Sequence, residues 1–578
     1  MDTLSDDRPR PFAHILRRGT GCGSIVNSEK QHADIEVCGS LSSTSSSDQA
    51  LLTAGSMTET EEIIEDNGTR LRGKRLYLAL AGLDALLFIA ALDLTIIATV
   101  YIEIANSFNA LGRAEWTVTS YMLAATAMQP LYGKFSDIVG RAPAIVVAVL
   151  LFVAGSVMCA VSHSMDMLVA SRAVQGLGGG GIMSLIFVVV ADVLSERERG
   201  KYIGIFTCTW GLASAVAPML GGLIVQRADW RLIFWVNLPF CAVALVLVLC
   251  FLRLPRPQGS LKAKAKKIDI VGATVFLAGV VPLLLGLSWG GREYAWTSPL
   301  VLACVIGGPL VLGLFIVVEC TVPVEPIVPS RLLRVRNVAL SSAAHLFYGA
   351  AGYGPIVFVP QWALLVRGAS AISAGIQLLP FTAGTVVTSV AGGFVMTRTG
   401  RYRRLVVSGA VLLCVGNSLL VLLDGEGTSR ALLVSSLFLS GLGAGACVQP
   451  MMMAAQAAVD GLDMAAVTTL CAFLRSLGAI LCVAILSSVI HSVSRDGLTR
   501  LAVAHPQYVF TIIQVADNQA VIHRPDVAPE LRSLIVAVFA RAMRCAFYAL
   551  MPFSALLVLL ALPFRHVDLD WNRKKTIK

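Results

Sequence analysis

The chain has 578 residues, of which 56% are hydrophobic and only 14% are charged. Soluble proteins carry about 25% charged residues, so the composition excludes an ordinary soluble domain and favours a polytopic helical membrane protein. The net charge of +10 would also suit a nucleic-acid partner. We expect none, because the basic residues cluster beside apolar segments, as described below.

Residues 1–72 differ in kind from the rest of the chain. They are polar, with a serine-rich stretch, SLSSTSSSDQ, at 40–49 and acidic residues between positions 59 and 66. No apolar core of a cleavable signal peptide precedes Leu76. The composition offers too little apolar surface for a packed core. We predict a disordered cytoplasmic tail.

Apolar segments long enough to cross about 30 Å of hydrocarbon at 1.5 Å per residue recur along the rest of the chain. We predict roughly fourteen of them, near residues 76–99, 118–136, 143–162, 166–190, 202–226, 233–252, 269–288, 299–319, 340–366, 373–396, 404–423, 432–456, 465–491 and 543–563. A long outer loop, about 492–540, is expected between the last two segments.

Lysine and arginine gather in alternate loops. These basic loops lie at residues 70–75, 134–141, 197–201, 262–267, 331–336 and 398–404, and a last cluster lies at 573–575. Because cytoplasmic loops of membrane proteins carry an excess of Lys and Arg, we expect both termini in the cytoplasm. The same asymmetry accounts for much of the basic net charge.

Two glycine patterns recur at an offset of about 260 residues. GKFSDIVGR at 133–141 matches GFVMTRTGR at 393–401, and Gly176-Leu-Gly178 matches Gly441-Leu-Gly443. We therefore predict two six-helix bundles, 73–255 and 336–565, joined by a linker, 256–335, that holds two additional spans. A cytoplasmic tail, 566–578, follows. Secondary transporters are commonly built from two similar halves with a binding site at their interface near the bilayer midplane.

Several motifs resemble those of one family of transporters. GKFSDIVGR (133–141), SRAVQGLGGGG (171–181) and GLASAVAPMLGG (211–222) resemble the loop 2–3, span 4 and span 5 antiporter motifs of the major facilitator superfamily. LDLTIIATV (92–100), WRLIFWVNLPF (230–240) and WGGREYAW (289–296) resemble its fourteen-span drug:proton antiporters. Overall, residues 76–565 are similar to fungal pumps that export toxins and other secondary metabolites.

This resemblance implies an all-α membrane protein with the major facilitator fold. It also implies proton-coupled export of an amphipathic small molecule, with protons and the lipid bilayer as the other partners. We expect a monomer in the plasma membrane, with the vacuolar membrane as the alternative. An importer or uniporter of a siderophore, a basic amino acid or another small solute on the same fold stays open, as does a sensor or scaffold.

Two charged residues lie inside predicted spans. Asp93 lies well within the first span, where an unpaired carboxylate costs several kcal/mol unless it is protonated, paired or hydrated. It is our candidate for proton coupling, with a structural polar contact as the alternative. Arg172 keeps its charge and must be paired; the resemblance implies that it communicates with the proton-carrying carboxylate or the substrate, and the alternative is a structural arginine. Asp84 points to the opposite helix face from Asp93; the resemblance implies no role for it, and it stays a second, unexplained candidate.

A second charged pair lies at a cytoplasmic turn. Asp137 and Arg141 are four residues apart, and Gly133 and Gly140 permit tight packing. We predict a charge latch that holds the two halves in one state. Ala142-Pro143 replace the extra basic residues that the resemblance would place after the arginine, so the latch is expected to be weaker than usual.

Other polar residues carry less specific signals. Asp192 and Arg199 either extend the latch or belong to a solvated loop. A lone span histidine, His345, is more often a satisfied polar contact than a functional group. A wide, apolar cavity with few polar anchors would suit an amphipathic ligand; its candidate lining residues are Gln175, Gln361, Trp362, Gln377 and Arg475.

The antiporter motif is rich in small residues. It comprises Gly204, Ala213, Ala217, Pro218, Gly221 and Gly222, with alanine in place of two glycines that the resemblance would place there. Small residues three and four apart let another helix approach closely, and Pro218 is expected to kink the span. We predict a tight, bent contact between the halves that seals one gate; ordinary small-residue packing is the alternative.

Enzymatic function is not supported by any motif. The sequence contains no P-loop and no HExxH motif, and its thirteen cysteines show no metal-site spacing. We therefore expect no cofactor and no metal ion, and no ATP-driven pumping by this chain alone.

Overall fold

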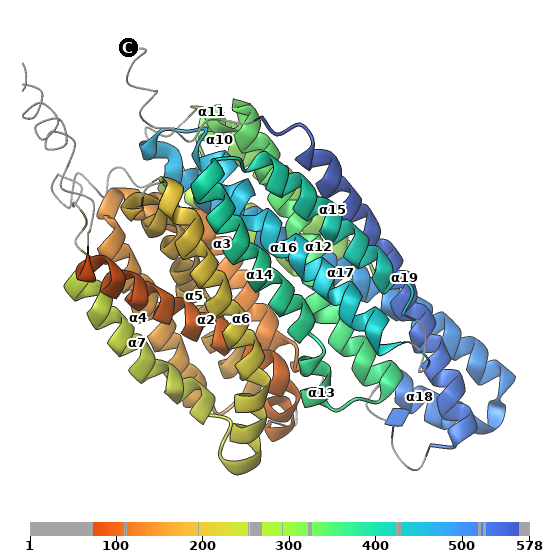
Figure 1. Cartoon of the computed structure of the whole chain (residues 1–578). Helices are drawn as coiled ribbons and strands as arrows, with labels where there is room; N and C mark the ends of the chain where they lie inside the picture. Colours follow the sequence, from red (N-terminus) through yellow and green to blue (C-terminus); the bar gives the residue numbers. More distant parts are fainter. Residues whose placement is uncertain are drawn as a thin grey trace, which may run out of the picture. The chain divides into compact units, whose positions relative to one another are not determined.

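The computed structural model describes residues 73–565, except 109, 111–112, 195, 253, 255–268, 292, 322–325, 424–426, 428, 518–521 and 524–526. The predicted N-terminal tail (1–72), the basic loop at 262–267 and the C-terminal tail (566–578) lie outside the described residues. The described part is built from helices (Figure 1).

Six long helices form the N-terminal half (hereafter the N-half). They are α2 (Lys74–Ser107), α3 (Trp116–Val139), α4 (Arg141–Ala160), α5 (Met165–Val193), α6 (Glu196–Arg227) and α7 (Leu232–Phe251). Two further helices follow, α9 (Ile270–Trp289) and α10 (Pro299–Thr321).

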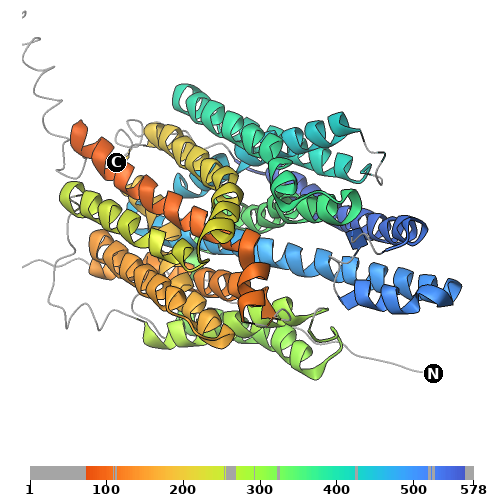
Figure 2. The ribbon, with the colours of Figure 1, turned by 90° about the horizontal axis from the view of Figure 1, so that it is seen from below.

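The C-terminal half (the C-half) contains the remaining helices. They are α11 (Ser330–Arg334), α12 (Arg336–Arg367), α13 (Ala371–Ile376), α14 (Leu379–Thr399), α15 (Arg403–Leu420), α16 (Arg430–Gln456), η2 (Gly461–Asp463), α17 (Met464–Ala504), η3 (Pro506–Tyr508), α18 (Val509–Asp517) and α19 (Pro529–Ala561). Figure 2 shows the red-to-yellow N-half helices beside the green-to-blue helices of the C-half.

Thirteen helices in the described part are long and apolar enough to cross a membrane. The predicted span at 118–136 corresponds to α3, which is 24 residues long but is not among the thirteen. It carries polar residues such as Thr117, Ser120 and Gln129, all of them buried. These side chains are tolerated because α3 packs between α5 and α17, where protein rather than lipid surrounds it.

The segment between the last two spans differs from the predicted loop. Helix α17 continues to Ala504, and α19 already begins at Pro529. With α18 between them, much of 492–540 is helical. This part of α17 extends beyond the neighbouring helices (Figures 1 and 2).

The repeat seen in the sequence has a structural counterpart. A Cβ on Gly178 would lie 2.3 Å from Phe152 N of α4, and one on Gly443 would lie 2.2 Å from Leu413 N of α15. Likewise, Gly176 packs on the backbone of α3 and Gly441 on that of α14. The same glycines therefore bring equivalent helices together in each half.

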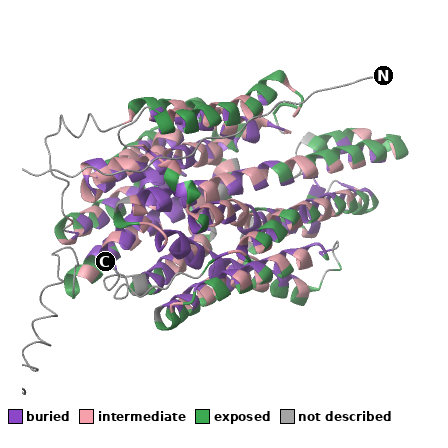
Figure 3. Ribbon diagram, turned by 90° about the horizontal axis from the view of Figure 1, so that it is seen from above, coloured by how far each residue is buried: buried purple, intermediate pink, exposed green. Residues whose placement is uncertain are grey.

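Each half has its own apolar core, and buried residues gather in the interior of the bundle (Figure 3). A smaller cluster joins α9 and α10 to the seam between the halves. In it, Phe276 of α9 packs on Phe315 of α10 and on Phe473 of α17. The two additional helices thus cover the place where α3 of the N-half meets α17 of the C-half.

Candidate functional site

The structure brings Asp93 of α2 and Arg172 of α5 together in the interior of the N-half. Arg172 Nη1 donates to Asp93 Oδ2 at 2.7 Å, and both side chains have no exposed surface. Arg172 Nε also donates to the backbone oxygen of Thr117 at 2.8 Å. The ion pair meets the requirement that a charge in a membrane span be partnered.

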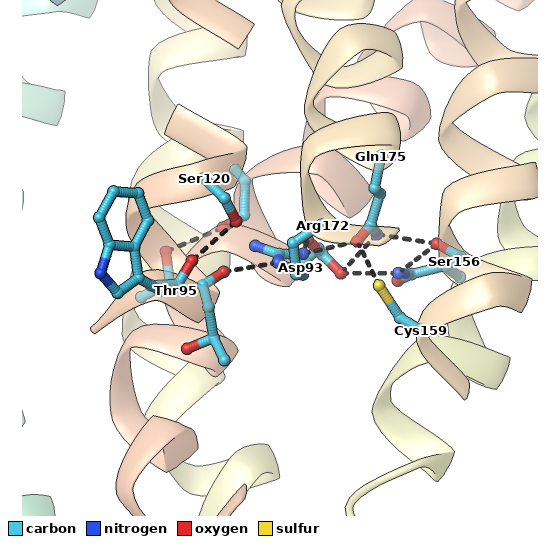
Figure 4. A network of polar contacts seen from close by, with 11 residues as sticks. Asp93, Thr95, Ser120, Ser156, Cys159, Arg172 and Gln175 are labelled. Atoms are coloured by element: carbon cyan, nitrogen blue, oxygen red, sulfur yellow. Dashed lines mark hydrogen bonds and ion pairs between the residues drawn. The ribbon is translucent and has the colours of Figure 1, made fainter. Parts of the chain in front are cut away.

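Amide side chains complete the surroundings of this carboxylate. Gln175 Nε2 and Asn237 Nδ2 donate to Asp93 Oδ1 at 2.9 and 2.8 Å. Both amides also donate to Ser156 Oγ, and Gln175 Oε1 accepts from Arg172 at 2.6 Å. Figure 4 shows Asp93 of α2, Arg172 and Gln175 of α5, and Ser156 of α4 pointing toward one another. We call Asp93, Arg172, Gln175, Asn237 and Ser156 the Asp93 network.

Glycines on α4 and α5 explain how these helices come close enough. A Cβ on Gly155 would lie 2.3 Å from Gln175 N, so only glycine lets α4 bring Ser156 beside Gln175. A Cβ on Gly176 would lie 2.4 Å from Tyr121 O, which holds α3 against α5 one turn from Arg172. The guanidinium of Arg172 stacks over the Tyr121 ring, 4.4 Å from its centroid.

Asp84 faces a different neighbour from Asp93. It accepts a hydrogen bond from Thr209 Oγ1 of α6 at 2.8 Å, while its Oδ1 is buried with no partner in the described part of the chain. The two aspartates of α2 thus lie on different helix faces.

The predicted latch residues Asp137 and Arg141 form an ion pair. Arg141 Nη1 lies 2.5 Å from Asp137 Oδ1, and its Nε lies 2.6 Å from Asp192 Oδ2 at the end of α5. Gly140, between α3 and α4, has φ +111°, a conformation that L side chains rarely adopt. We call the end of the bundle that holds this turn the latch end. Asp192 joins this ion-pair cluster, and all three residues lie in the N-half, so the cluster does not itself bridge the halves as predicted.

Arg199 lies beside the latch but makes different contacts. Its Nη2 and Nε donate to the backbone oxygens of Ala191 and Leu194, where α5 ends. Its Nη1 donates at 3.5 Å to Gln456 Oε1 of α16. A cation at the carbonyl end of a helix is favourably placed, and this one also reaches the C-half.

Gly133 and Gly393, the paired glycines of the repeat, both lie where the halves meet at the latch end. A Cβ on Gly133 of α3 would lie 2.4 Å from Thr469 Oγ1 of α17. A Cβ on Gly393 of α14 would lie 2.4 Å from Gly200 O of α6. The two inter-half contacts, α3 with α17 and α6 with α14, are therefore built alike.

The antiporter motif divides between two surfaces of α6, which runs unbroken through position 218. Gly204 faces α14 of the C-half, where an added Cβ would lie 3.3 Å from Ser389 O. Gly221 instead faces α2 of its own half, and a Cβ on Gly222 would have no atom of the described residues within 4 Å. Ala213 and Ala217 are fully buried within the N-half core. These contacts correct the prediction of one groove between the halves.

Gln449 of α16 is a site residue that the sequence did not indicate. With its amide oriented to satisfy both groups, it donates to Gly200 O at 3.1 Å and accepts from Gly204 N at 2.9 Å. Gln449 can reach these backbone groups because both α6 residues are glycines and carry no side chain that would cover them. A glutamine in an apolar span was the only available signal.

The predicted cavity residues do not form one group. Gln175 belongs to the Asp93 network and is fully buried. Trp362 lies in the C-half core, and Gln377 lies in the short turn between α13 and α14. Gln361 is partly buried near the end of α12. Arg475, on α17, stands apart from them.

Comparison with known proteins identifies the family. The Major Facilitator Superfamily profile matches residues 83–482. The chain belongs to the Major Facilitator Superfamily. Efflux pump FUS6 of Gibberella fujikuroi is 33% identical over 423 residues, covering 73% of this chain and 76% of the relative. MFS efflux transporter aclA of Aspergillus oryzae is 35% identical over 421 residues, covering 72% and 75%.

Solved structures agree with the fold. The human organic anion transporter MFSD10 superposes with a TM-score of 0.57 at 16% identity, covering 85% of this chain and 100% of that one. A bacterial homologue of the lysosomal transporter Spinster gives 0.52 at 17% identity, covering 85% and 98%. The chain is thus a multi-pass membrane transporter of the efflux-pump type, not an enzyme, as the sequence predicted.

Proposed function

We propose that the chain exports amphipathic small molecules, such as toxins or secondary metabolites, in exchange for protons. The buried ion pair between Asp93 and Arg172 carries this proposal, because it places a titratable carboxylate against a permanent cation inside the membrane. The relatives named as efflux pumps support the outward direction and the class of substrate. We place the protein, as a monomer, in the plasma membrane with both termini in the cytoplasm.

The Asp93 network explains how one proton changes the structure. When Asp93 is ionised, it accepts hydrogen bonds from Arg172, Gln175 and Asn237. A proton on Asp93 removes the charge attraction that joins α2 to α5. Arg172 then retains Thr117 O, Gln175 Oε1 and the Tyr121 ring as partners. Protonation therefore weakens the contact between α2 and α5, while the guanidinium of Arg172 keeps its other partners.

Alternating access would follow from opening and closing the contacts between the halves. At the latch end, Gly133 meets Thr469, Gly200 meets Gly393, and Gln449 bridges the α6 backbone. With the latch end cytoplasmic, these contacts close the cytoplasmic side. The pair of Asp137 and Arg141 lies within the N-half, so it would support this closed state indirectly, by holding α3 and α4 in the arrangement in which α3 meets α17.

Gradient-driven transport of a neutral probe in everted membrane vesicles tests the proposal. We expect the native protein to accumulate 1-pyrenebutyramide faster when the vesicle interior is acidic. Asp93→Asn keeps the size of the side chain but carries no titratable proton, so its transport should no longer respond to the gradient. Asp166→Asn, at an exposed position on α5, is the matched control and should behave as the native protein.

The outcomes separate the alternatives. Equal gradient dependence in Asp93→Asn and in the native protein would refute coupling through Asp93. Equilibration by the native protein at the same rate with and without the gradient would indicate a uniporter. Protein-free vesicles give the passive leak of the probe, which is subtracted from both rates.

A further inference from the structure

Arg475 is a half-buried cation within a span of the C-half, and it has no anionic partner among the described residues. It lies on α17, eleven residues after that helix begins at Met464. Its guanidinium makes no ion pair or side-chain hydrogen bond with any described residue. The aromatic ring of Phe187, on α5 of the N-half, lies 5.9 Å from it. A guanidinium within a span needs a counter-charge or water, and a single ring at this distance compensates it weakly.

In the described part of the chain, the C-half has no acidic residue placed to pair with Arg475. Helices α12, α14, α15 and α16 contain no Asp or Glu, α19 contains only Glu530 in its first turn, and α17 contains only Asp496. That residue is twenty-one positions from Arg475, or about 30 Å along a helix. Asp463, just before α17, pairs with Arg331. In the N-half, Asp93 is paired with Arg172.

Uncommitted hydrogen-bonding groups lie on the neighbouring helix α12. His345, Tyr348 and Tyr353 lie within four residues of Gly349, the position at which the α12 backbone meets that of Arg475. His345 is fully buried, and its Nε2 has no partner in the described part of the chain. Tyr348 and Tyr353 are partly exposed, and none of the hydrogen bonds of the described residues uses their hydroxyls.

Close packing of α12 on α17 fixes this cluster. A Cβ on Gly349 would lie 1.9 Å from Arg475 O, and one on Gly478 would lie 1.8 Å from Leu346 O. The two helix backbones are therefore in direct contact at Arg475 and again at Gly478, about one turn further along α17. Because Phe187 comes from the opposite half, the guanidinium lies at the interface between the halves, where a substrate of such a transporter binds.

We propose that Arg475, with Tyr348, Tyr353 and His345, binds the acidic group of an anionic amphipathic substrate, a carboxylate on an apolar body. A carboxylate supplies the missing negative charge and accepts the hydrogen bonds that these side chains leave unused. The apolar body of the substrate packs against aromatic surface such as Phe187. This inference rests on the proposed export function and narrows its substrate class.

Two probes with the same apolar body test the inference. 1-Pyrenebutyric acid is ionised at neutral pH, and its amide is not. In purified protein in detergent, Arg475→Gln should weaken binding of the acid roughly 10- to 100-fold, the range for a lost charge-assisted hydrogen bond, and leave binding of the amide unchanged. Arg475→Lys should restore part of the affinity for the acid. Arg495→Gln, at an exposed position on the same helix, is the matched control.

The possible outcomes distinguish a failure of the substrate inference from a failure of the proposed export function. Equal loss of both probes in Arg475→Gln, with a native size-exclusion profile, would make Arg475 structural and overturn the inference. So would unchanged affinity for the acid. If the native protein exports the amide but neither binds nor exports the acid, only the inference fails. If it exports neither probe under the imposed gradient, the proposed function fails as well.

Discussion

A buried charge depends on its partners, and the Asp93 network supplies most of them; within the network, Arg172 Nη2 alone is buried without a hydrogen-bond partner among the described residues. Both oxygens of Asp93 accept hydrogen bonds, and its counter-charge Arg172 is held by Thr117 O and the Tyr121 ring. Removal of one partner from such a pair leaves an uncompensated charge and is strongly destabilising. The pair is therefore more sensitive to substitution than its net contribution to stability suggests.

Arg172→Lys is expected to be a severe substitution despite the conserved charge. A lysine ammonium cannot reproduce the fork that joins Thr117 O, Asp93 and Gln175, because its donors radiate from one atom. We expect a loss of about 1–3 kcal/mol in stability and a marked fall in gradient-driven transport. Thermal unfolding in detergent and the vesicle assay measure these effects.

Arg113→Lys is the matched control for that prediction. Arg113 pairs with Asp166, and both side chains are exposed, so the change should cost about 0–1 kcal/mol. If Arg172→Lys unfolds and transports as this control does, the geometry of the fork is unimportant.

At the scale of helices, close approach depends on positions where a single methyl group has no room. Gly393→Ala illustrates this, because the new Cβ would lie 2.4 Å from Gly200 O, a backbone atom that moves only if α6 and α14 separate. We expect normal membrane insertion but a several-fold loss of transport, since the contact at the latch end no longer closes. Gly307→Ala in α10, where nothing lies within 4 Å, should transport normally; equal rates for the two variants would contradict the prediction.

The sequence predicts helices better than it predicts their contacts. Hydropathy located the segment of every long helix, because burial in lipid demands a long apolar run. It missed the helical extension of α17 to Ala504 because that stretch carries polar residues such as Arg495 and Arg500. The partners of Asp93 could not be predicted from the sequence either. Asn237 and Ser156 are ordinary polar residues in the sequence, and only the fold places them beside the carboxylate. Gly222 shows the converse, since it fits the spacing of the motif, yet a Cβ added there would meet no described atom within 4 Å.

At the scale of the whole molecule, the two halves share a scaffold but differ in charge. In the C-half, Asn417 donates to Ser554 Oγ and to Ala351 O, and Ser440 donates to Asn417, so the corresponding network is neutral. The ion pairs of Asp93 and of the latch both belong to the N-half, whereas the unpaired cation, Arg475, belongs to the C-half. This division fits a transporter in which one half carries the proton and the other carries the charge that attracts the substrate.

Alternating access requires the halves to move against each other, and a cross-link at the latch end tests that motion. A Cβ on Gly133 would lie 3.2 Å from Thr469 Cβ, slightly below the range of about 3.5–4.5 Å for disulfides. In a background without the native cysteines, Gly133→Cys with Thr469→Cys should form a disulfide on oxidation, stop transport, and regain it on reduction. The single variants, oxidised in the same way, control for the substitutions themselves. Undiminished transport by the cross-linked protein, with the disulfide verified by mass spectrometry, would show that the cycle proceeds without separation of α3 from α17.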